Sequence, residues 1–284
     1  MFSAFANYWK FGRKTEHSMT TGEPKDTWAA GKLYEPYVGR WSRLVAKNFL
    51  AWLEMPPNLD WLDVGCGTGA LTDVILRHAK PRSVKGVDPS AGYVEHARAH
   101  IIDPRATFDV GDAQSLPLDS GRFDVTAAGL VLNFVPNPSL AVREMARTVR
   151  PGGVVAAYVW DYAGKMELMR YFWDAAVELD RAALEFDEGR RFPLCKPDPL
   201  IELFTQSRLR EVQVVPIDVP TRFRDFDDYW TPFLGGQGPA PGYAMSLSEE
   251  RRRALRDRIR GKLPIARDGS IDLIARAWAV RSRT

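Results

Sequence analysis

The chain has 284 residues, of which 45% are hydrophobic and 26% are charged, and its basic and acidic side chains leave a formal charge of +3. This composition is ordinary for a globular protein and allows a substantial core. A net charge this small argues against nucleic acid or a membrane surface as a partner. The two cysteines, Cys66 and Cys195, make neither a disulfide framework nor a metal site, so we expect a cytoplasmic protein without a metal.

The first 18 residues mix aromatic and basic side chains without the continuous apolar region of a signal peptide. We expect residues 1–18 to be a disordered or over-long tail and residues 19–284 to form a single domain. No apolar run approaches the length needed to cross a bilayer, so membrane insertion is not expected.

From residue 59 to residue 160, short apolar runs alternate with amphipathic ones, which is typical of a parallel sheet covered by helices. The expected strands cover residues 59–64, 84–87, 106–110, 123–131 and 154–160. The expected helices cover residues 70–76, 94–101 and 140–149. Ahead of the first strand, helical spacing is shown by Tyr34, Tyr37, Arg40 and Trp41.

After Trp160 the pattern changes. It indicates an aromatic helix over 166–180, strands over 210–219 and 271–280, a Gly/Pro-rich loop over 231–243 and a charged helix over 246–262. We therefore predict an α/β fold, a Rossmann-like, doubly wound and mostly parallel sheet with an antiparallel final strand. Its cofactor core is expected over about 34–160, and a helical and loop cap over about 161–206 and 222–267.

The run from Asp63 to Gly69, Asp-Val-Gly-Cys-Gly-Thr-Gly, joins a buried strand to a helix through three alternate glycines. Glycine tolerates positive φ and lets the backbone approach a ligand closely, as in nucleotide-binding loops. Gly65-x-Gly67-x-x-Ala70 also satisfies the dinucleotide fingerprint, and Asp88 stands at the right distance for a ribose contact, so an NAD(P)-dependent oxidoreductase is one interpretation. Asp63 favours a different cofactor, one that carries an ammonium and a sulfonium group, because a carboxylate at this position attracts such cations and repels a pyrophosphate.

The same run resembles motif I of class I S-adenosylmethionine-dependent methyltransferases, in particular the type 11 group with the ubiquinone and menaquinone enzymes. The resemblance extends over most of residues 34–160 and implies S-adenosylmethionine as cofactor and S-adenosylhomocysteine as product. It implies that Asp88 binds the ribose hydroxyls, that Asp112 and Ala113 bind the adenine, and that Tyr34 or Arg40 lies near the cofactor carboxylate. The full set of cofactor-binding residues that it implies is Tyr34, Arg40, Asp63, Gly65, Cys66, Gly67, Gly69, Asp88, Pro89, Asp112, Ala113 and Leu130.

Simpler interpretations exist for several of these residues. An Asp after a strand is a common loop cap, which is the alternative for Asp88 and Asp112. An aromatic stripe on a helix usually packs against a core, which is the alternative for Tyr34 and its neighbours. The basic run Arg251-Arg252-Arg253 is interleaved with acidic residues and indicates a solvated helix face rather than a phosphate site.

Methyl transfer is an in-line displacement that needs alignment and exclusion of water, and it needs a general base only when the acceptor must lose a proton. None of the four histidines is expected on the acceptor side, which leaves Asn133 and Asp161 as candidate catalytic residues. A helix cap is the alternative for Asp161. The segment Asn133-Phe134-Val135-Pro136 departs from the Asn-Pro-Pro-Tyr motif of base-modifying relatives, which argues against nucleic acid as the acceptor.

We therefore expect methyl transfer from S-adenosylmethionine to a small aromatic or lipophilic metabolite. The candidate substrate-facing residues are Phe134, Trp160, Trp173, Trp230 and Phe233. The alternatives are the NAD(P)-dependent oxidoreductase above and a protein that binds S-adenosylmethionine without turnover.

Overall fold

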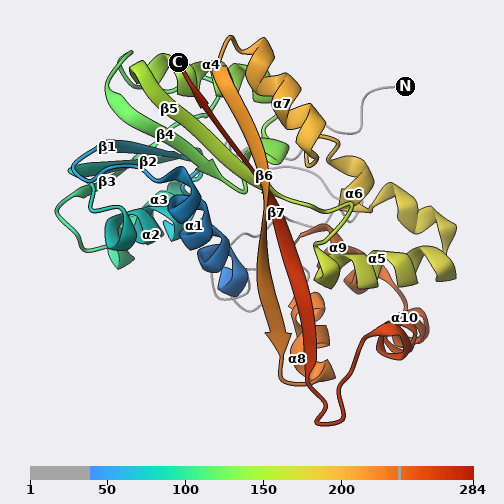
Figure 1. Cartoon of the computed structure of the whole chain (residues 1–284). Coiled ribbons are helices and arrows are strands. Elements are labelled where there is room, and N and C mark those ends of the chain that lie inside the picture. The colour runs from blue at the N-terminus through green and yellow to red at the C-terminus, as the bar shows by residue number, and fades with distance from the viewer. Residues whose placement is uncertain (1–38, 236–237) are drawn as a thin grey trace, which may run out of the picture.

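In the computed structural model of the chain, residues 39–235 and 238–284 are described, and they contain one seven-stranded sheet in the order β3-β2-β1-β4-β5-β7-β6 (Figure 1). β7 pairs antiparallel with both β5 and β6, whereas the other pairs are parallel. This confirms the predicted Rossmann-like sheet with an antiparallel final strand. The strands are β1 (Asp60–Val64), β2 (Ser83–Asp88), β3 (Ala106–Val110), β4 (Phe123–Gly129), β5 (Val149–Trp160), β6 (Arg210–Phe223) and β7 (Ile271–Arg283).

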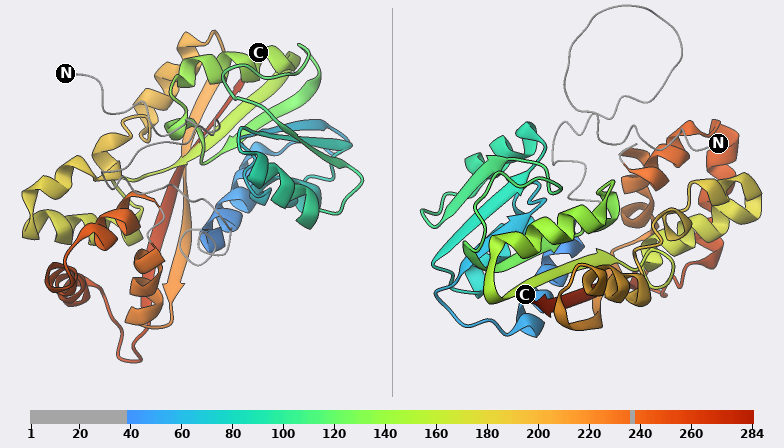
Figure 2. Two further views of the ribbon diagram at one scale, coloured as in Figure 1. Left: turned by 180° about the vertical axis from the view of Figure 1, so that it is seen from behind. Right: turned by 90° about the horizontal axis from the view of Figure 1, so that it is seen from above.

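The helices cover both faces of the sheet because the chain winds in two directions. From β1 it steps outward through α2 (Ala70–His78) and α3 (Ala91–His100), and from β4 it steps the other way through α4 (Pro138–Thr148). Right-handed crossovers then place α2 and α3 on one face and α4 on the other. α1 (Arg40–Leu53) packs on α2, and α7 (Pro197–Gln206) packs on α4 (Figure 2). The strand order reverses between β1 and β4, and open α/β sheets bind ligands at the carboxyl ends of the strands at such a point.

The cap consists of two insertions that pack together through α5 against α9 and α10. Together they stand beyond the end of the sheet, beside the long strands β6 and β7 (Figure 1). The first insertion follows β5 and contains α5 (Glu167–Leu179), the 3-10 helix η4 (Arg181–Glu185) and α6 (Glu188–Arg191). The second lies between β6 and β7 and contains α8 (Phe226–Trp230), the 3-10 helix η5 (Thr231–Gly235), α9 (Pro239–Ser246) and α10 (Glu249–Lys262).

The prediction of a loop over 231–243 is wrong, because its described residues form η5 and most of α9. Pro239 opens α9, where the proline ring presets the helical φ and the missing N–H costs nothing. β6 continues to Phe223, past the predicted end at residue 219, because alternate residues up to Phe223 remain buried. The segment predicted as cap over 161–206 also includes α7, which packs against β6 and α4.

β6 is one of the two edge strands of the sheet and pairs only with β7. It carries Pro216 and Pro220, whose nitrogens cannot donate to a further strand. Within residues 39–235 and 238–284, no helix is both long and apolar enough to cross a membrane.

Candidate active site

The three loop glycines have φ angles of 71°, 53° and 92° at Gly65, Gly67 and Gly69, which side-chain-bearing residues rarely adopt. A Cβ at Gly65 would lie 2.5 Å from a Val131 methyl group, and one at Gly69 would overlap Ile101. A Cβ at Gly67 would meet none of the described atoms within 4 Å. Gly67 is therefore the point of the loop where a ligand can come close to the backbone.

Asp63 lies beneath this loop and is only 1% exposed. Its Oδ2 accepts a 2.6 Å hydrogen bond from the Thr72 hydroxyl at the start of α2, whereas the buried Oδ1 has no hydrogen-bond partner in the described structure. Burial raises the pKa of Asp63 to about 7, against the lowering effect of the Thr72 hydrogen bond. Leaving a buried carboxylate oxygen without a partner is unfavourable, so the site suits a ligand that brings positive charge.

Asp88 ends β2 beside the glycine loop. Its Oδ2 accepts a hydrogen bond from the Gly67 N–H and its Oδ1 accepts one from the Ser90 N–H, both at 2.9 Å. Burial raises the pKa of Asp88, and the two backbone hydrogen bonds oppose that shift. Each oxygen keeps a further lone pair, so the same carboxylate can cap the loop and accept from a ribose diol.

The segment predicted for adenine lies beside Asp88, since the Gly111 N–H donates to the Asp88 carbonyl at 3.1 Å. Asp112 is exposed and its Oδ1 accepts from the Gln114 N–H at 2.8 Å, while Ala113 is buried. Pro89 is half-buried in the turn after β2. The structure thus brings the predicted ribose and adenine residues to one edge of the sheet.

Cys66 contributes to the loop through its backbone, whose N–H donates to the Val87 carbonyl at 3.1 Å. Its side chain packs with Val94, Ala97 and Phe108, and burial raises the pKa of the thiol well above its usual value. The thiol is therefore a packing group rather than a nucleophile.

Leu130 follows β4 with a φ of 62°, an uncommon conformation for a residue with a side chain. Its N–H donates to the Tyr158 carbonyl at 2.8 Å, which holds the chain in place as it leaves the sheet. The next residue, Val131, is the one whose methyl groups stand against Gly65. Strained backbone of this kind clusters at functional sites, and here it brings the end of β4 to the glycine loop.

Arg40 opens α1, and its Nη1 lies 3.3 and 3.4 Å from the two carboxylate oxygens of Asp228, a partner that the sequence analysis missed. The guanidinium also lies over the rings of Trp41 and Phe223, at 4.4 and 4.8 Å from their centroids. Its Nε and Nη2, the edge suited to a bidentate carboxylate, are buried and make no hydrogen bond with any described group. The cofactor role of Arg40 stays a prediction, and Tyr34 lies outside the described residues.

The two candidate catalytic residues differ in their surroundings. The buried Asp161 carboxylate accepts from the Lys165 N–H at 2.9 Å and its carbonyl accepts from Gly164 and Met166, so it caps the turn before α5. Asn133 belongs to the 3-10 turn η3 (Leu132–Phe134), and its buried Nδ2 has no partner among the described residues. Asn133 therefore has unused hydrogen-bonding capacity, whereas Asp161 has a structural role.

Of the predicted substrate-facing aromatic residues, only Phe134 is exposed, at 36%. The Phe233 ring lies inside the cap, where it stacks on the Phe172 ring with 4.6 Å between their centroids. Its centroid lies 6.0 Å from that of the Trp230 ring. The buried Trp173 indole N–H donates to Glu188, and burial raises the pKa of Glu188 to about 7. Trp160 is buried at the end of β5. Trp173, Trp230 and Phe233 therefore lie in the interior of the cap. The contact of all five predicted residues with a substrate stays a prediction.

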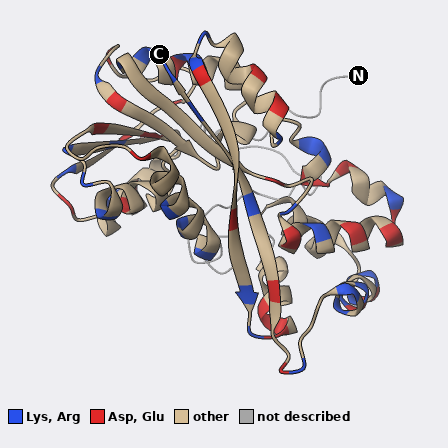
Figure 3. Cartoon of the chain, in the orientation of Figure 1, with Lys and Arg blue, Asp and Glu red and all other residues tan. Residues whose placement is uncertain are grey.

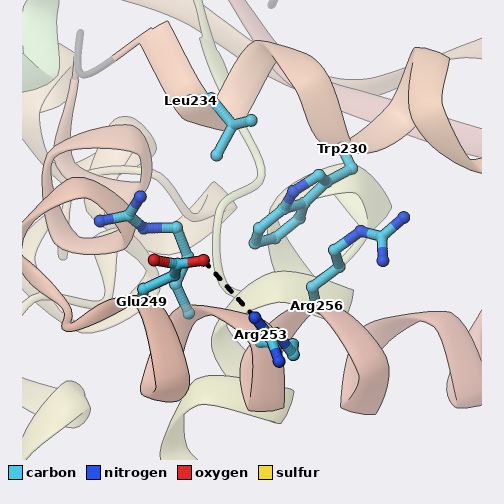
Figure 4. Close-up of a pocket in the computed structure, with 6 residues that line it drawn as sticks. Trp230, Leu234, Glu249, Arg253 and Arg256 are labelled. Carbon is cyan, nitrogen blue, oxygen red and sulfur yellow. Dashed lines mark hydrogen bonds and ion pairs between the residues drawn. The ribbon is translucent and has the colours of Figure 1, made fainter.

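A hollow of about 210 Å³ lies between Trp230, Leu234 and α10 (Figure 4). The many basic residues of α10 are blue in Figure 3. Arg253 pairs with Glu249 at 3.4 Å and Arg256 with Asp227 at 3.5 Å. These two arginines are thus paired with carboxylates, as expected for a solvated helix face, and Arg252 donates to the carbonyls of Ala244 and Leu247. All of the residues that line the hollow belong to the second insertion, so it is separate from the glycine loop. In residues 39–235 and 238–284, no cluster of three or more His, Cys, Asp or Glu side chains could hold a metal.

Residues 62–157, from β1 almost to the end of β5, match the family model described as a methyltransferase domain. This segment is a class I S-adenosylmethionine-dependent methyltransferase domain. The chain is also 28% identical over 188 residues to 2-methyl-6-phytyl-1,4-hydroquinone methyltransferase of Synechocystis sp., covering 65% of this chain and 57% of that protein. It is 32% identical over 114 residues to trans-aconitate 2-methyltransferase of Deinococcus radiodurans, and the match covers 40% of this chain and 43% of that protein.

The methyltransferase fold extends beyond the matched segment. A structure of a putative methyltransferase from an antibiotic biosynthesis pathway of Anabaena variabilis superposes with a TM-score of 0.60 at 17% identity, covering 85% of this chain and 97% of that one. This likeness concerns the fold alone. The chain spans about half the length of these two curated relatives.

Proposed function

We propose that the protein transfers the methyl group of S-adenosylmethionine to a small aromatic or lipophilic metabolite. The observation that carries the choice of cofactor is the buried Asp63 carboxylate, whose Oδ1 has no partner among the described residues and which stands two residues before the first glycine of the loop with its open position at Gly67. The same carboxylate would repel the pyrophosphate of a dinucleotide. The strand order also departs from the dinucleotide order 3-2-1-4-5-6, because β7 lies antiparallel between β5 and β6.

In this proposal the protein acts by binding and orientation. Asp88 holds the ribose, Asp112 and Ala113 hold the adenine, and the Gly67 backbone lies along the methionine portion. When bound, S-adenosylmethionine supplies an activated methyl group, and its sulfur keeps the bonding electron pair when the acceptor takes that group. The buried interior of the cap helps to exclude water, which favours a displacement that disperses charge.

The nature of the acceptor is the less constrained part of the proposal. The two relatives are named for a phytyl hydroquinone and for trans-aconitate, which supports a small molecule but not one chemical class. The aromatic composition of the cap and the partly exposed Phe134 favour a flat or apolar acceptor.

Calorimetric titration of the purified protein with S-adenosylmethionine, S-adenosylhomocysteine and NADH tests the cofactor. We expect both adenosyl ligands to bind and NADH not to compete, and binding of NADH alone would refute the proposal. Incubation with methyl-labelled S-adenosylmethionine and a metabolite extract tests turnover. Label should appear in a small organic product, whereas binding without any transfer would leave a cofactor-binding protein.

A further inference from the structure

Three aromatic rings from distant segments meet where β4 and β5 end. The Phe192 ring centroid lies 5.1 Å from that of Phe134, edge to face, and 5.5 Å from that of Tyr162. Phe134 follows β4, Tyr162 follows β5 and Phe192 follows α6. This aromatic corner therefore stands at the edge of the sheet where a doubly wound fold binds its ligands.

Two of the three rings of the aromatic corner are more open than the cap interior. Phe134 is 36% exposed and Phe192 is half-buried, whereas Tyr162 is buried and Phe172, Trp173 and Phe233 are fully buried. Large rings that remain accessible beside a packed cluster are candidates for ligand contact, because a flat molecule can stack there without repacking the core.

The aromatic corner is next to the cofactor loop and is held in place from two sides. On one side, Val131 stands against Gly65, two residues before Asn133. On the other, Arg170 donates to the Tyr162 carbonyl at 2.9 Å and to both carboxylate oxygens of Asp187, at 2.8 and 2.9 Å. These hydrogen bonds tie the start of α6, and with it Phe192, to the loop after β5.

Asn133 adds a polar group to this apolar surface. Its buried Nδ2, which no described residue satisfies, lies in the same 3-10 turn as Phe134. A buried amide without a partner is unfavourable, so a ligand oxygen that accepts from it would stabilise the complex. A hydroxyl suits the amide in either of its two orientations, because a hydroxyl both donates and accepts.

We propose that Asn133, Phe134, Tyr162 and Phe192 form the acceptor subsite and that it takes a flat ring bearing a hydroxyl group. Phe134 and Phe192 stack on the acceptor, the buried Tyr162 supports Phe192, and Asn133 orients the acceptor hydroxyl, so Asn133 is a positioning residue. This inference rests on the methyltransferase function proposed above. It places the acceptor on the aromatic corner rather than on Trp160, Trp173, Trp230 and Phe233.

The test uses 2-naphthol and naphthalene as probes, titrated by fluorescence into the full-length protein saturated with S-adenosylhomocysteine. The native protein should bind 2-naphthol about tenfold more tightly than naphthalene, the difference expected for one good hydrogen bond. Asn133→Leu should abolish that preference while leaving naphthalene binding unchanged. Phe134→Ala and Phe192→Ala should weaken both probes about tenfold or more.

Phe186→Ala is the matched control, because Phe186 is an exposed cap ring whose centroid lies 5.6 Å from that of Tyr243, outside the aromatic corner. It should leave both probes unaffected. The inference is overturned if the native protein does not bind 2-naphthol, if the preference survives Asn133→Leu, or if Phe186→Ala matches the other two alanine variants. Binding of S-adenosylhomocysteine is measured first in every variant, so its failure in the native protein would reject the cofactor assignment instead.

Discussion

The edge of the sheet over β1, β2 and β3, proposed to bind the cofactor, is built differently from the edge over β4, β5 and the cap, proposed to bind the acceptor. The first half is built from backbone, with glycines at positive φ and carboxylates that cap strand ends and already hold the loop. The second half is built from side chains delivered by insertions, such as Phe192 after α6. A backbone-built site depends on a few residue types at fixed spacing, whereas a site built by insertions can change its lining without changing the sheet.

The largest effect that separates the two halves is expected at the glycine loop. In Gly65→Ala the new Cβ combines positive φ with a clash against Val131, so the free energy of unfolding should fall by about 3 kcal/mol or more. Gly67 and the remote Gly121 also have positive φ, but a Cβ at either position would enter open space. Gly67→Ala and Gly121→Ala should therefore each lower the free energy of unfolding by only about 1–2 kcal/mol. Thermal and denaturant unfolding measure this order, and equal losses in all three would contradict it.

The same series separates folding from binding. Gly121→Ala should retain cofactor affinity, because Gly121 lies in the turn before β4, away from the loop. Gly67→Ala should lose that affinity, because its methyl group occupies the space left for the ligand. Titration calorimetry with S-adenosylhomocysteine makes the comparison.

Next in size is the loss of the ribose contact. Asp88→Ala removes a buried carboxylate placed for two charge-assisted hydrogen bonds and should weaken S-adenosylhomocysteine about a hundredfold. Asp112→Ala removes an exposed carboxylate, and its cost should stay below about tenfold because water competes for the same contact. Comparable losses in both variants, measured by calorimetry, would show that burial does not set the strength of these contacts.

Cofactor affinity should also depend on pH through Asp63. Burial raises the pKa of this carboxyl to about 7, so below that pH it is mostly neutral and offers little attraction to a cation. Affinity for S-adenosylmethionine should rise about tenfold between pH 6 and pH 8, with release of a proton on binding. In Asp63→Asn the affinity should be lower and nearly independent of pH over this range. A native profile as flat as that of the variant would contradict the assignment.

The smallest effect is expected in the cap. Burial raises the pKa of Glu188 to about 7, so the folded state holds a proton that the unfolded chain gives up above its ordinary pKa. The resulting stability is present at low pH and is lost as pH rises through 7. Glu188→Gln should therefore raise the melting temperature at pH 8, by about 2–4 °C for each kcal/mol, and change it little at pH 5. Cofactor affinity should not change, in contrast to Asp63→Asn.

The backbone geometry of the edge over β1, β2 and β3 was predictable because it is local in sequence, whereas its contacts with the cofactor stay a prediction. The spacing of Gly65, Gly67 and Gly69 and the strand ends at Asp88 and Asp112 indicate backbone geometry directly. Thr72, which donates to Asp63, and Val131, which packs on Gly65, were not singled out because they need the folded contact to reveal their part.

The residues that line the proposed acceptor site were less predictable, because aromatic content does not distinguish a cavity wall from a packed interior. Trp173 and Phe233 were chosen on composition, and both are fully buried. Tyr162 and Phe192 carry no local signal, since 30 residues and several turns of helix separate them before they meet. Asp228 pairs with Arg40 across 188 positions, a distance at which sequence spacing carries no information.

The placement of β7 has a consequence for how the protein is made. β6 pairs only with β7, and β7 is translated after the whole second insertion. Until then the emerging chain exposes two unpaired strand borders, one on β5 and one on β6, which are templates for aggregation. The sheet is therefore completed only when β7 enters between two strands that precede it in the chain.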